Sequence, residues 1–359
     1  MNRSLFGRKI AAAREGHLSA RLIIMGHSHV AGEGSGSGGG LVDAGRHGVA
    51  EKLAEKLTLA GVSAIRSGWM GDYNTSVDSR DINSFDSRIS AGAGWSSYPT
   101  NIILGGRHLS QSGAPGSNGP LAFSPAFSFQ KARIWFPTAI GLTERLGVYL
   151  DGSLKAEINQ SRANSISSVE VVTTVPADVL EVKSLDEKPA FWAGVEFFPT
   201  TKPDIAISVA GGRGQRTADF VNSAAEWSAL HGLEAFCADM TVIYAMTNDL
   251  TSNTPVATFK QNLSILAVTS VVRGNCIIVI DPPANLPQFW NGNYEEYAAA
   301  AADVAQRYGC GLVDARHAFS RSWDRANCDG LMSDLAHPSA LGHSFMADLI
   351  ADEVLRFID

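Results

Sequence analysis

A serine, a histidine and an aspartate lie at positions of the sequence where they could act together on an acyl group. Ser28 follows the apolar run 21–25, and Asp334 and His337 lie in the segment SDLAHP before the last apolar helix pattern. A serine hydroxyl is a weak nucleophile that needs a general base. His337 is a candidate base, and Asp334 is placed to orient its imidazole and stabilise the imidazolium. The three residues predict nucleophilic acyl transfer.

Such chemistry also needs hydrogen-bond donors for the oxyanion of the tetrahedral intermediate. The amide of Ser28, an amide of the glycine turn in 211–220 and the side chain of Asn248 are candidates. Asp249 follows Asn248 directly, and we interpret it as a cap of the turn rather than as a catalytic group.

Two histidines flank the serine, and they raise the alternative of a metal site. His27 and His29 are two residues apart, but a catalytic zinc site needs a third protein ligand. No residue nearby in the sequence supplies one, so we predict no metal and no cofactor. The glycine run 32–40 lacks the lysine that closes a phosphate-binding loop, which favours a surface loop. For His343, on the last helix, we expect a surface or capping role.

The elements that must position these residues alternate between strands and helices at the two ends of the chain. A strand at 21–25, a helix at 48–61 and a strand at 62–65 come first. From residue 204 onward, strands again alternate with helices, including one predicted over 219–230. Such alternation is typical of a parallel sheet covered on both faces, whose carboxyl ends form one ligand-binding edge.

The middle of the chain, 81–203, has a different pattern. Short runs of aromatic and β-branched residues recur between turn residues, and Asp151-Gly152 is a strong hairpin signal. We therefore predict an antiparallel β-sandwich inserted into a parallel α/β domain. The predicted parts are 1–80 and 204–359 for the α/β domain and 81–203 for the insert, which is a candidate carbohydrate-binding unit.

Composition limits the remaining possibilities. The chain has 359 residues, is 45% hydrophobic and carries a net charge of −7. Without a basic run it offers no nucleic-acid surface, and without a long apolar run it offers no membrane span. The four cysteines have no metal or disulfide spacing, so we expect reduced thiols. No signal peptide is visible, and we expect a cytoplasmic protein, or a virion- or tail-associated one if the chain comes from a phage.

The order Ser28, glycine turn, Asn248-Asp249 and Asp334-x-x-His337 resembles the SGNH or GDSL hydrolase superfamily. The resemblance covers about 240 residues and omits the middle segment. It implies a flavodoxin-like three-layer α/β/α sandwich and ester hydrolysis through an acyl-serine. It assigns Ser28 as nucleophile and oxyanion donor, Asn248 as another donor, His337 as base and Asp334 as its partner. Gly214 fits the family's glycine donor best, and Gly212 and Gly71 are alternatives.

Members of this superfamily with a β-sandwich insert act on O-acetylated glycans, and similar layouts occur in phage tail-associated proteins. The resemblance thus implies a carbohydrate acetylesterase whose partner is a carbohydrate or another small acylated ester. We name His29, Phe289 and Trp290 as candidate substrate contacts. His27 replaces the family's aspartate and Met246 a glycine. These departures leave open a non-catalytic glycan-binding or tail-structural protein, and the same triad also allows an acyltransferase.

Overall fold

The computed structural model describes most of the chain. The described residues are 4–36, 42–71, 80–97, 103–105, 108–111, 118–139, 142, 145–186, 189–290 and 293–358. No helix among them is long and apolar enough to span a lipid bilayer.

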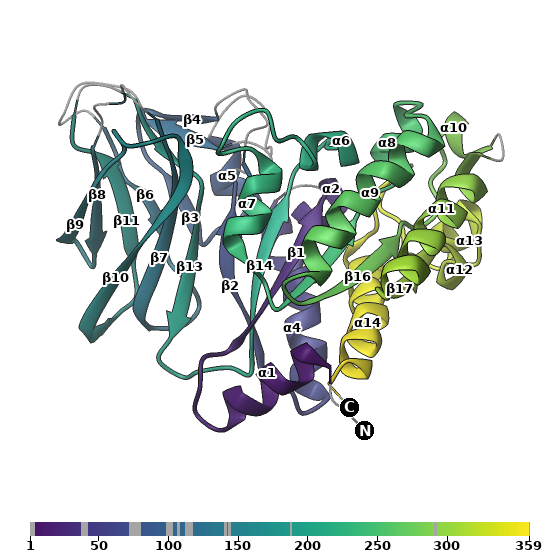
Figure 1. The fold of residues 1–359 in the computed structure, drawn as a ribbon, viewed down its shortest axis with the longest axis horizontal. Helices are drawn as coiled ribbons and strands as arrows, with labels where there is room; N and C mark the ends of the chain where they lie inside the picture. The colour runs from purple at the N-terminus through teal and green to yellow at the C-terminus, as the bar shows by residue number, and fades with distance from the viewer. Residues whose placement is uncertain are drawn as a thin grey trace.

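A nine-stranded sheet runs through the molecule in the order β10-β7-β13-β2-β14-β1-β15-β16-β17 (Figure 1). Its six consecutive parallel strands are β2 (Ala64–Met70), β14 (Ile205–Gly211), β1 (Ala20–Gly26), β15 (Met240–Tyr244), β16 (Asn275–Ile280) and β17 (Gly311–Asp314). Without β2, the order β14-β1-β15-β16-β17 is the 2-1-3-4-5 order of flavodoxin-like folds.

Helices cover both faces of the parallel strands. In chain order they are α1 (Leu5–Arg14), α2 (Ser28–Ala31), α3 (Ala44–His47), α4 (Val49–Leu59), α5 (Arg80–Phe85), α6 (Thr217–Phe220), α7 (Ala229–Phe236), α8 (Thr247–Thr251), α9 (Val256–Val271), α10 (Pro287–Trp290), α11 (Asn293–Tyr308), α12 (Ala315–Ala318), α13 (Trp323–Cys328) and α14 (Ala340–Arg356). Apolar residues of α1, α4 and α14 pack on one face, and those of α7, α9 and α11 on the other. The predicted three-layer α/β fold is confirmed.

Burial on both faces explains why the first strand reads as an unbroken apolar run. Leu22 and Ile24 point into one core, Ile23 and Met25 point into the other, and all four are 0% exposed. A strand with only one buried face would instead alternate between apolar and polar residues.

Three antiparallel strands from the middle of the chain extend the parallel sheet beyond β2. They are β13 (Gly194–Pro199), β7 (Phe129–Thr138) and β10 (Ser165–Ala177). A five-stranded sheet packs against them, formed by β3 (Ile89–Ala91), β6 (Leu121–Phe123), β11 (Leu180–Ser184), β8 (Arg145–Leu150) and β9 (Ser153–Asn159). A small third sheet consists of β12 (Ala190–Trp192), β5 (Leu109–Gln111) and β4 (Trp95–Ser97).

Between the two larger sheets lies an aromatic core. The Phe197 ring of β13 is 4.7 Å from that of Phe129 and 6.3 Å from that of Phe123, which belongs to the five-stranded sheet. The middle segment thus forms two packed layers, one of which is hydrogen-bonded to β2 of the parallel sheet. We keep the division at 81 and 203 as a proposal about domains.

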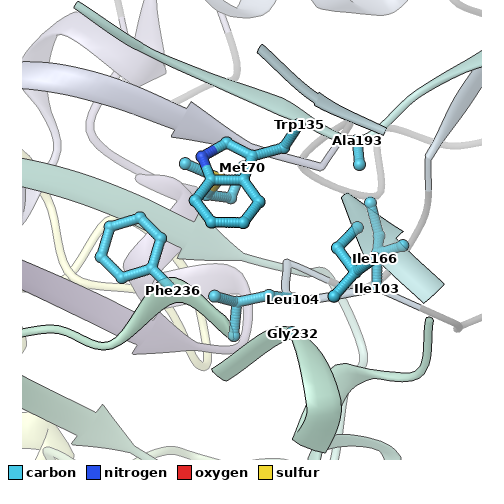
Figure 2. Close-up of a pocket in the computed structure, with 8 residues that line it drawn as sticks. All are labelled: Met70, Ile103, Leu104, Trp135, Ile166, Ala193, Gly232 and Phe236. Atoms are coloured by element: carbon cyan, nitrogen blue, oxygen red, sulfur yellow. The ribbon is translucent and has the colours of Figure 1, made fainter. Parts of the chain in front are cut away.

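Helix α7 packs on the sheet where the antiparallel strands from the middle of the chain join the parallel ones. Figure 2 shows the Trp135 and Phe236 rings facing each other beside Met70, with Leu104 close to Gly232. A Cβ on Gly232 would lie 3.0 Å from that of Leu104, so a glycine lets the helix approach this closely. The apolar cavity between these residues has a volume of only about 10 Å³. We interpret it as a packing defect rather than a ligand site.

The local predictions differ from the structure mainly at one helix. The single helix predicted over 219–230 is wrong, because the chain forms α6, a turn and then α7. The Asn222 side chain accepts a hydrogen bond from the Ala224 amide, and this local bond competes with helix continuation. The predicted hairpin is confirmed, since Asp151 and Gly152 both have positive φ and join β8 to β9.

Candidate functional site

Ser28 is presented at the carboxyl edge of the parallel sheet by a sharp turn. β1 ends at Gly26, and α2 begins at Ser28. A Cβ on Gly26 would lie 2.4 Å from the Tyr244 carbonyl oxygen, and the φ of this residue is +155°, so the turn requires glycine. A single residue, His27, therefore separates the end of a buried strand from the helix that Ser28 begins.

The His337 loop is shaped by hydrogen bonds of its own residues. Asp334 Oδ1 accepts from the amides of Ala336 and His337, each at 2.7 Å, in an Asx-type turn. The Ser333 amide donates to the His337 carbonyl oxygen at 2.9 Å. α14 starts shortly afterwards, with Ser339 as its N-cap. The imidazole is thus held on a tight loop at the start of a long, buried helix.

The structure brings Ser28, His337 and Asp334 into one hydrogen-bonded line. Ser28 Oγ is 3.1 Å from His337 Nε2, and His337 Nδ1 is 2.8 Å from Asp334 Oδ2. The carboxylate can only accept, so Nδ1 carries a proton and Nε2 of the neutral ring is free to take one from the serine. This is the arrangement of a nucleophile, a base and an orienting carboxylate.

The charges around His337 favour its protonated form. Burial by itself lowers the pKa of His337, but the hydrogen bond to Asp334 and the charge of Glu33 outweigh it and raise the pKa above the ordinary 6.5. Partial burial would raise the pKa of Asp334, yet the hydrogen bonds from His337 and two backbone amides bring it well below its usual range. Asp334 therefore stays ionised wherever the ring titrates.

Glu33 and Arg213 are two site residues that the sequence reasoning missed. Glu33 Oε2 lies 3.5 Å from His337 Nε2, and both carboxylate oxygens bind the Arg213 guanidinium, at 2.8 and 3.1 Å. Glu33 is only 8% exposed although it lies in a glycine-rich run. An acidic residue among glycines is a weak signal, and its partner is 180 residues away in the chain.

The three glycines predicted as oxyanion donors differ in the hydrogen bonding of their backbone amides. The Gly212 amide donates to the Gly26 carbonyl at 2.9 Å, and the Gly71 amide donates to the Ala193 carbonyl at 2.7 Å. Both alternatives to Gly214 are therefore already engaged in backbone hydrogen bonds. No such bond of the Gly214 amide is found within the described residues, and its φ of +71° suits glycine.

Asn248 follows β15 on the other side of β1. Within the described part of the chain, its Nδ2 donates one hydrogen bond, to the Gln215 carbonyl at 2.9 Å. An amide nitrogen carries two hydrogens, so the second is available to a substrate oxygen. The contact also joins the asparagine to the residue that follows Gly214.

His29 and His27 are both buried. His29 is 2% exposed and its Nε2 donates to the Ala336 carbonyl oxygen at 3.0 Å, and its role as a substrate contact stays a prediction. His27 Nε2 is 2.7 Å from Oδ2 of the buried Asp281. Asp281 was missed, although it too follows the end of a predicted strand, which is the signal that identified Ser28 and Asn248.

Three further residues discussed from the sequence are buried near the site. Asp249 is buried and accepts from the Thr217 amide and hydroxyl at 2.8 and 2.7 Å, so it holds the start of α6, and a role as cap of its own turn stays a prediction. Met246 is completely buried in the core. His343 is buried as well, which corrects the expected surface or capping role: its Nε2 donates to the Glu33 carbonyl oxygen, and burial lowers its pKa to about 3.

The two aromatic candidates follow β16. Phe289 is half-buried, with its ring 4.9 Å from that of Tyr294. Its segment contacts the His337 loop, since the Asn285 amide donates to the Leu335 carbonyl. The Trp290 side chain lies outside what the structure describes.

Comparisons with known proteins give one family match. Residues 196–345 match the model of the GDSL-like lipase/acylhydrolase family. No curated protein matches the chain. Similar solved structures include a protein from Bacillus subtilis (13% identity, TM-score 0.39, covering 75% of this chain and 91% of that one). Others are a lipase/acylhydrolase from Enterococcus faecalis (24%, 0.35, 42% and 75%) and an acetylxylan esterase from Geobacillus stearothermophilus (18%, 0.34, 42% and 72%). These identities and TM-scores are too low to carry over an activity.

The matched segment contains Gly214, Asn248, Asp334 and His337, while Ser28 lies upstream of it. The parallel sheet places β1 between β14 and β15, so Ser28 meets the residues of the matched segment at one edge. The match of residues 196–345 to the GDSL-like lipase/acylhydrolase model, together with this arrangement, supports a carboxylic ester hydrolase.

Proposed function

We propose that the protein is a serine esterase that removes small acyl groups, acetyl foremost, from an O-acylated carbohydrate through an acyl-serine intermediate. The observation that carries the serine mechanism is the hydrogen-bonded line from Ser28 through His337 to Asp334. The carbohydrate ester is the substrate class implied by the family resemblance.

In the first step, His337 Nε2 takes the Ser28 hydroxyl proton as the oxygen attacks the ester carbonyl carbon. The resulting imidazolium is stabilised by Asp334, whose carboxylate accepts from Nδ1. The negative oxygen of the tetrahedral intermediate would accept hydrogen bonds from the backbone amides of Ser28 and Gly214 and from the second hydrogen of Asn248 Nδ2.

Collapse of this intermediate breaks the bond to the sugar oxygen. His337 returns its proton to that oxygen, so a neutral alcohol leaves and the acyl group stays on Ser28. A water molecule then attacks the acyl carbon as His337 takes a proton from it. The bond from this carbon to Ser28 Oγ breaks, His337 returns the proton to the serine oxygen, and the carboxylic acid leaves. The same base thus serves both halves of the reaction.

The alternative of a scaffold without activity rested on His27 and Met246, the two departures from the family pattern. Both side chains are buried, and neither displaces Ser28, His337 or Asp334 from its hydrogen bonds. An acyltransferase would use the same triad, with a sugar hydroxyl in place of water.

Replacement of Ser28 tests the mechanism. We expect Ser28→Ala to lower kcat on an aryl acetate by roughly 10³-fold or more, because removal of a nucleophile leaves only the remaining binding and oxyanion contacts. Ser223→Ala, at an exposed serine, is the matched control and should retain full activity. Equal turnover by the two variants would exclude the serine mechanism.

The substrate class needs a separate measurement. Acetyl, butyryl and octanoyl aryl esters would be compared first, and O-acetylated oligosaccharides second, with products analysed in the presence of a free sugar acceptor. We expect a preference for acetyl and release of acetate. Transfer of the acetyl group to the added sugar would instead establish an acyltransferase.

A further inference from the structure

Two histidines and an aspartate that the proposed mechanism does not use form a buried cluster beside the catalytic line. His27 and His29 flank Ser28 in the chain, and Asp281 follows β16. Their side chains are 1%, 2% and 0% exposed. One ligand atom from each lies within 4.8 Å of the other two.

The tautomer of His29 is fixed by its surroundings. Nε2 lies 3.0 Å from the Ala336 carbonyl oxygen, which can only accept, so Nε2 carries the proton. The ring is buried, which disfavours a second proton on it. Its Nδ1 therefore presents a lone pair to the interior.

The lone pair of His29 Nδ1 faces a carboxylate oxygen of Asp281. His29 Nδ1 is 3.8 Å from Asp281 Oδ1, which is too long for a hydrogen bond. Both atoms are fully buried, and neither has a hydrogen-bond partner among the described residues. Two electron-rich atoms in this position repel each other unless positive charge lies between them.

Asp281 also brings a charge into the interior. Oδ2 accepts from His27 Nε2 and from the Thr247 amide and hydroxyl, at 2.7, 2.8 and 2.7 Å. No lysine or arginine of the described residues forms an ion pair with it. Buried charges are paired or coordinate metals, and the ionic partners of this carboxylate among the described residues are the His27 and His29 imidazoles.

We propose that His27, His29 and Asp281 bind one divalent transition-metal ion, for which Zn²⁺ is the best-fitting probe. Two imidazoles and one carboxylate are a common zinc ligand set. The Zn–N and Zn–O bond lengths add up to about 4.2 Å, so one ion can bond both atoms of the 3.8 Å pair. The His29 hydrogen bond to a backbone carbonyl is the usual outer contact of a metal-bound histidine.

His27 joins as the third ligand by changing its tautomer. Its Nε2–H donates to Asp281 Oδ2, and its Nδ1 accepts from the His29 amide at 3.4 Å. Ion binding at Nε2 would move the ring proton to Nδ1 and replace this long amide contact. The ion would tie both neighbours of Ser28 to the end of β16. Its role would be to hold the serine turn in place, and the proposal does not depend on the activity proposed for the triad.

Metal binding to the chelator-treated full chain tests the proposal directly. Exposed thiols would compete for zinc, so the Cys237→Ser/Cys328→Ser form serves as the parent. It would be titrated with ZnCl2 in a calorimeter and with CoCl2 by visible absorption. We expect one ion per chain, nitrogen- and oxygen-coordinated Co²⁺, and a higher thermal midpoint with zinc.

Variants of the parent locate the ion. His29→Gln should weaken binding by more than the roughly 10- to 100-fold that loss of an outer contact costs. His337→Gln and His17→Gln, at the triad and at the exposed surface, should bind like the parent. A parent that binds no ion overturns the proposal, and this measurement needs no variant to fold. Undiminished binding by His29→Gln, or loss of binding in His337→Gln, also overturns it.

Discussion

At the scale of single residues, the acid–base properties of His337 depend on two carboxylates with different roles. Asp334 bonds Nδ1 and fixes the ring, whereas Glu33 lies near Nε2, on the side where the serine proton arrives. Burial lowers the pKa of the ring, and the two carboxylates together raise it by more. The base must be neutral to act, so activity should rise with pH as His337 loses its proton, at an apparent pKa above 6.5.

Glu33→Gln should move this acidic limb of the kcat/KM profile to lower pH. The substitution removes a negative charge near the ring and leaves the positive charge of Arg213, and both effects lower the pKa of His337. Profiles of wild type, Glu33→Gln and the surface control Glu226→Gln would be measured on one aryl acetate. A limb that stays in place in Glu33→Gln would show that Glu33 does not tune the base.

Asp334→Asn should lower kcat by about 10³- to 10⁴-fold with little change in KM. An amide at this position no longer stabilises the imidazolium and favours the wrong tautomer of His337. Steady-state kinetics on the same ester would measure kcat and KM separately. A change confined to KM would instead place Asp334 in substrate binding.

At the scale of elements, the site depends on two loops that pack backbone to backbone. A Cβ on Gly34 would lie 2.4 Å from the Pro338 carbonyl oxygen and from Ser333 Oγ, and Gly34 has a φ of +89°. The glycine loop after α2 thus lies directly on the loop that carries His337. The glycine run predicts a surface loop here, and neither this contact nor the burial of Ser35 (2% exposed) can be predicted from composition.

Gly34→Ala should destabilise the protein and lower kcat, whereas Gly61→Ala should only destabilise it. Gly61 has a similar φ of +85° but open space around its Cβ position, so it isolates the cost of backbone strain, of order 1–3 kcal/mol. The clash at Gly34 adds about 1–3 kcal/mol and displaces the His337 loop. Urea unfolding and ester turnover would be compared, and equal results for the two variants would count against the packing argument.

At the scale of the whole molecule, the α/β fold could be predicted because strand–helix alternation and strand-end residues are local signals. Ser28 and Asn248 were found at predicted strand ends, and Asp334 and His337 just before the last predicted helix. The structure brings His337 and Asp334 to Ser28. The join between β13 and β2 could not be predicted, since edge pairing depends on strands more than a hundred residues apart. The pairing of Glu33 with Arg213 could not be predicted either, because the two residues are also far apart in the sequence.

The shared sheet predicts that the chain unfolds as one unit. Phe197 is 1% exposed and contacts aromatic rings of both sheets, so Phe197→Ala should cost about 3–5 kcal/mol. Because β13 pairs with β2, loss of esterase activity and loss of far-UV signal should coincide in urea. Activity that outlasts an early structural transition would show that the middle segment unfolds independently.

The most direct test of the account is whether an acyl group becomes attached to Ser28. The protein would be mixed with an aryl acetate, quenched in acid during turnover and digested, and the peptide that contains Ser28 would be sequenced by mass spectrometry. We predict one acetyl group on Ser28, and none there in the His337→Ala variant. Turnover of the ester with Ser28 unmodified, or with the acetyl group on another residue that turnover requires, would contradict the central claim.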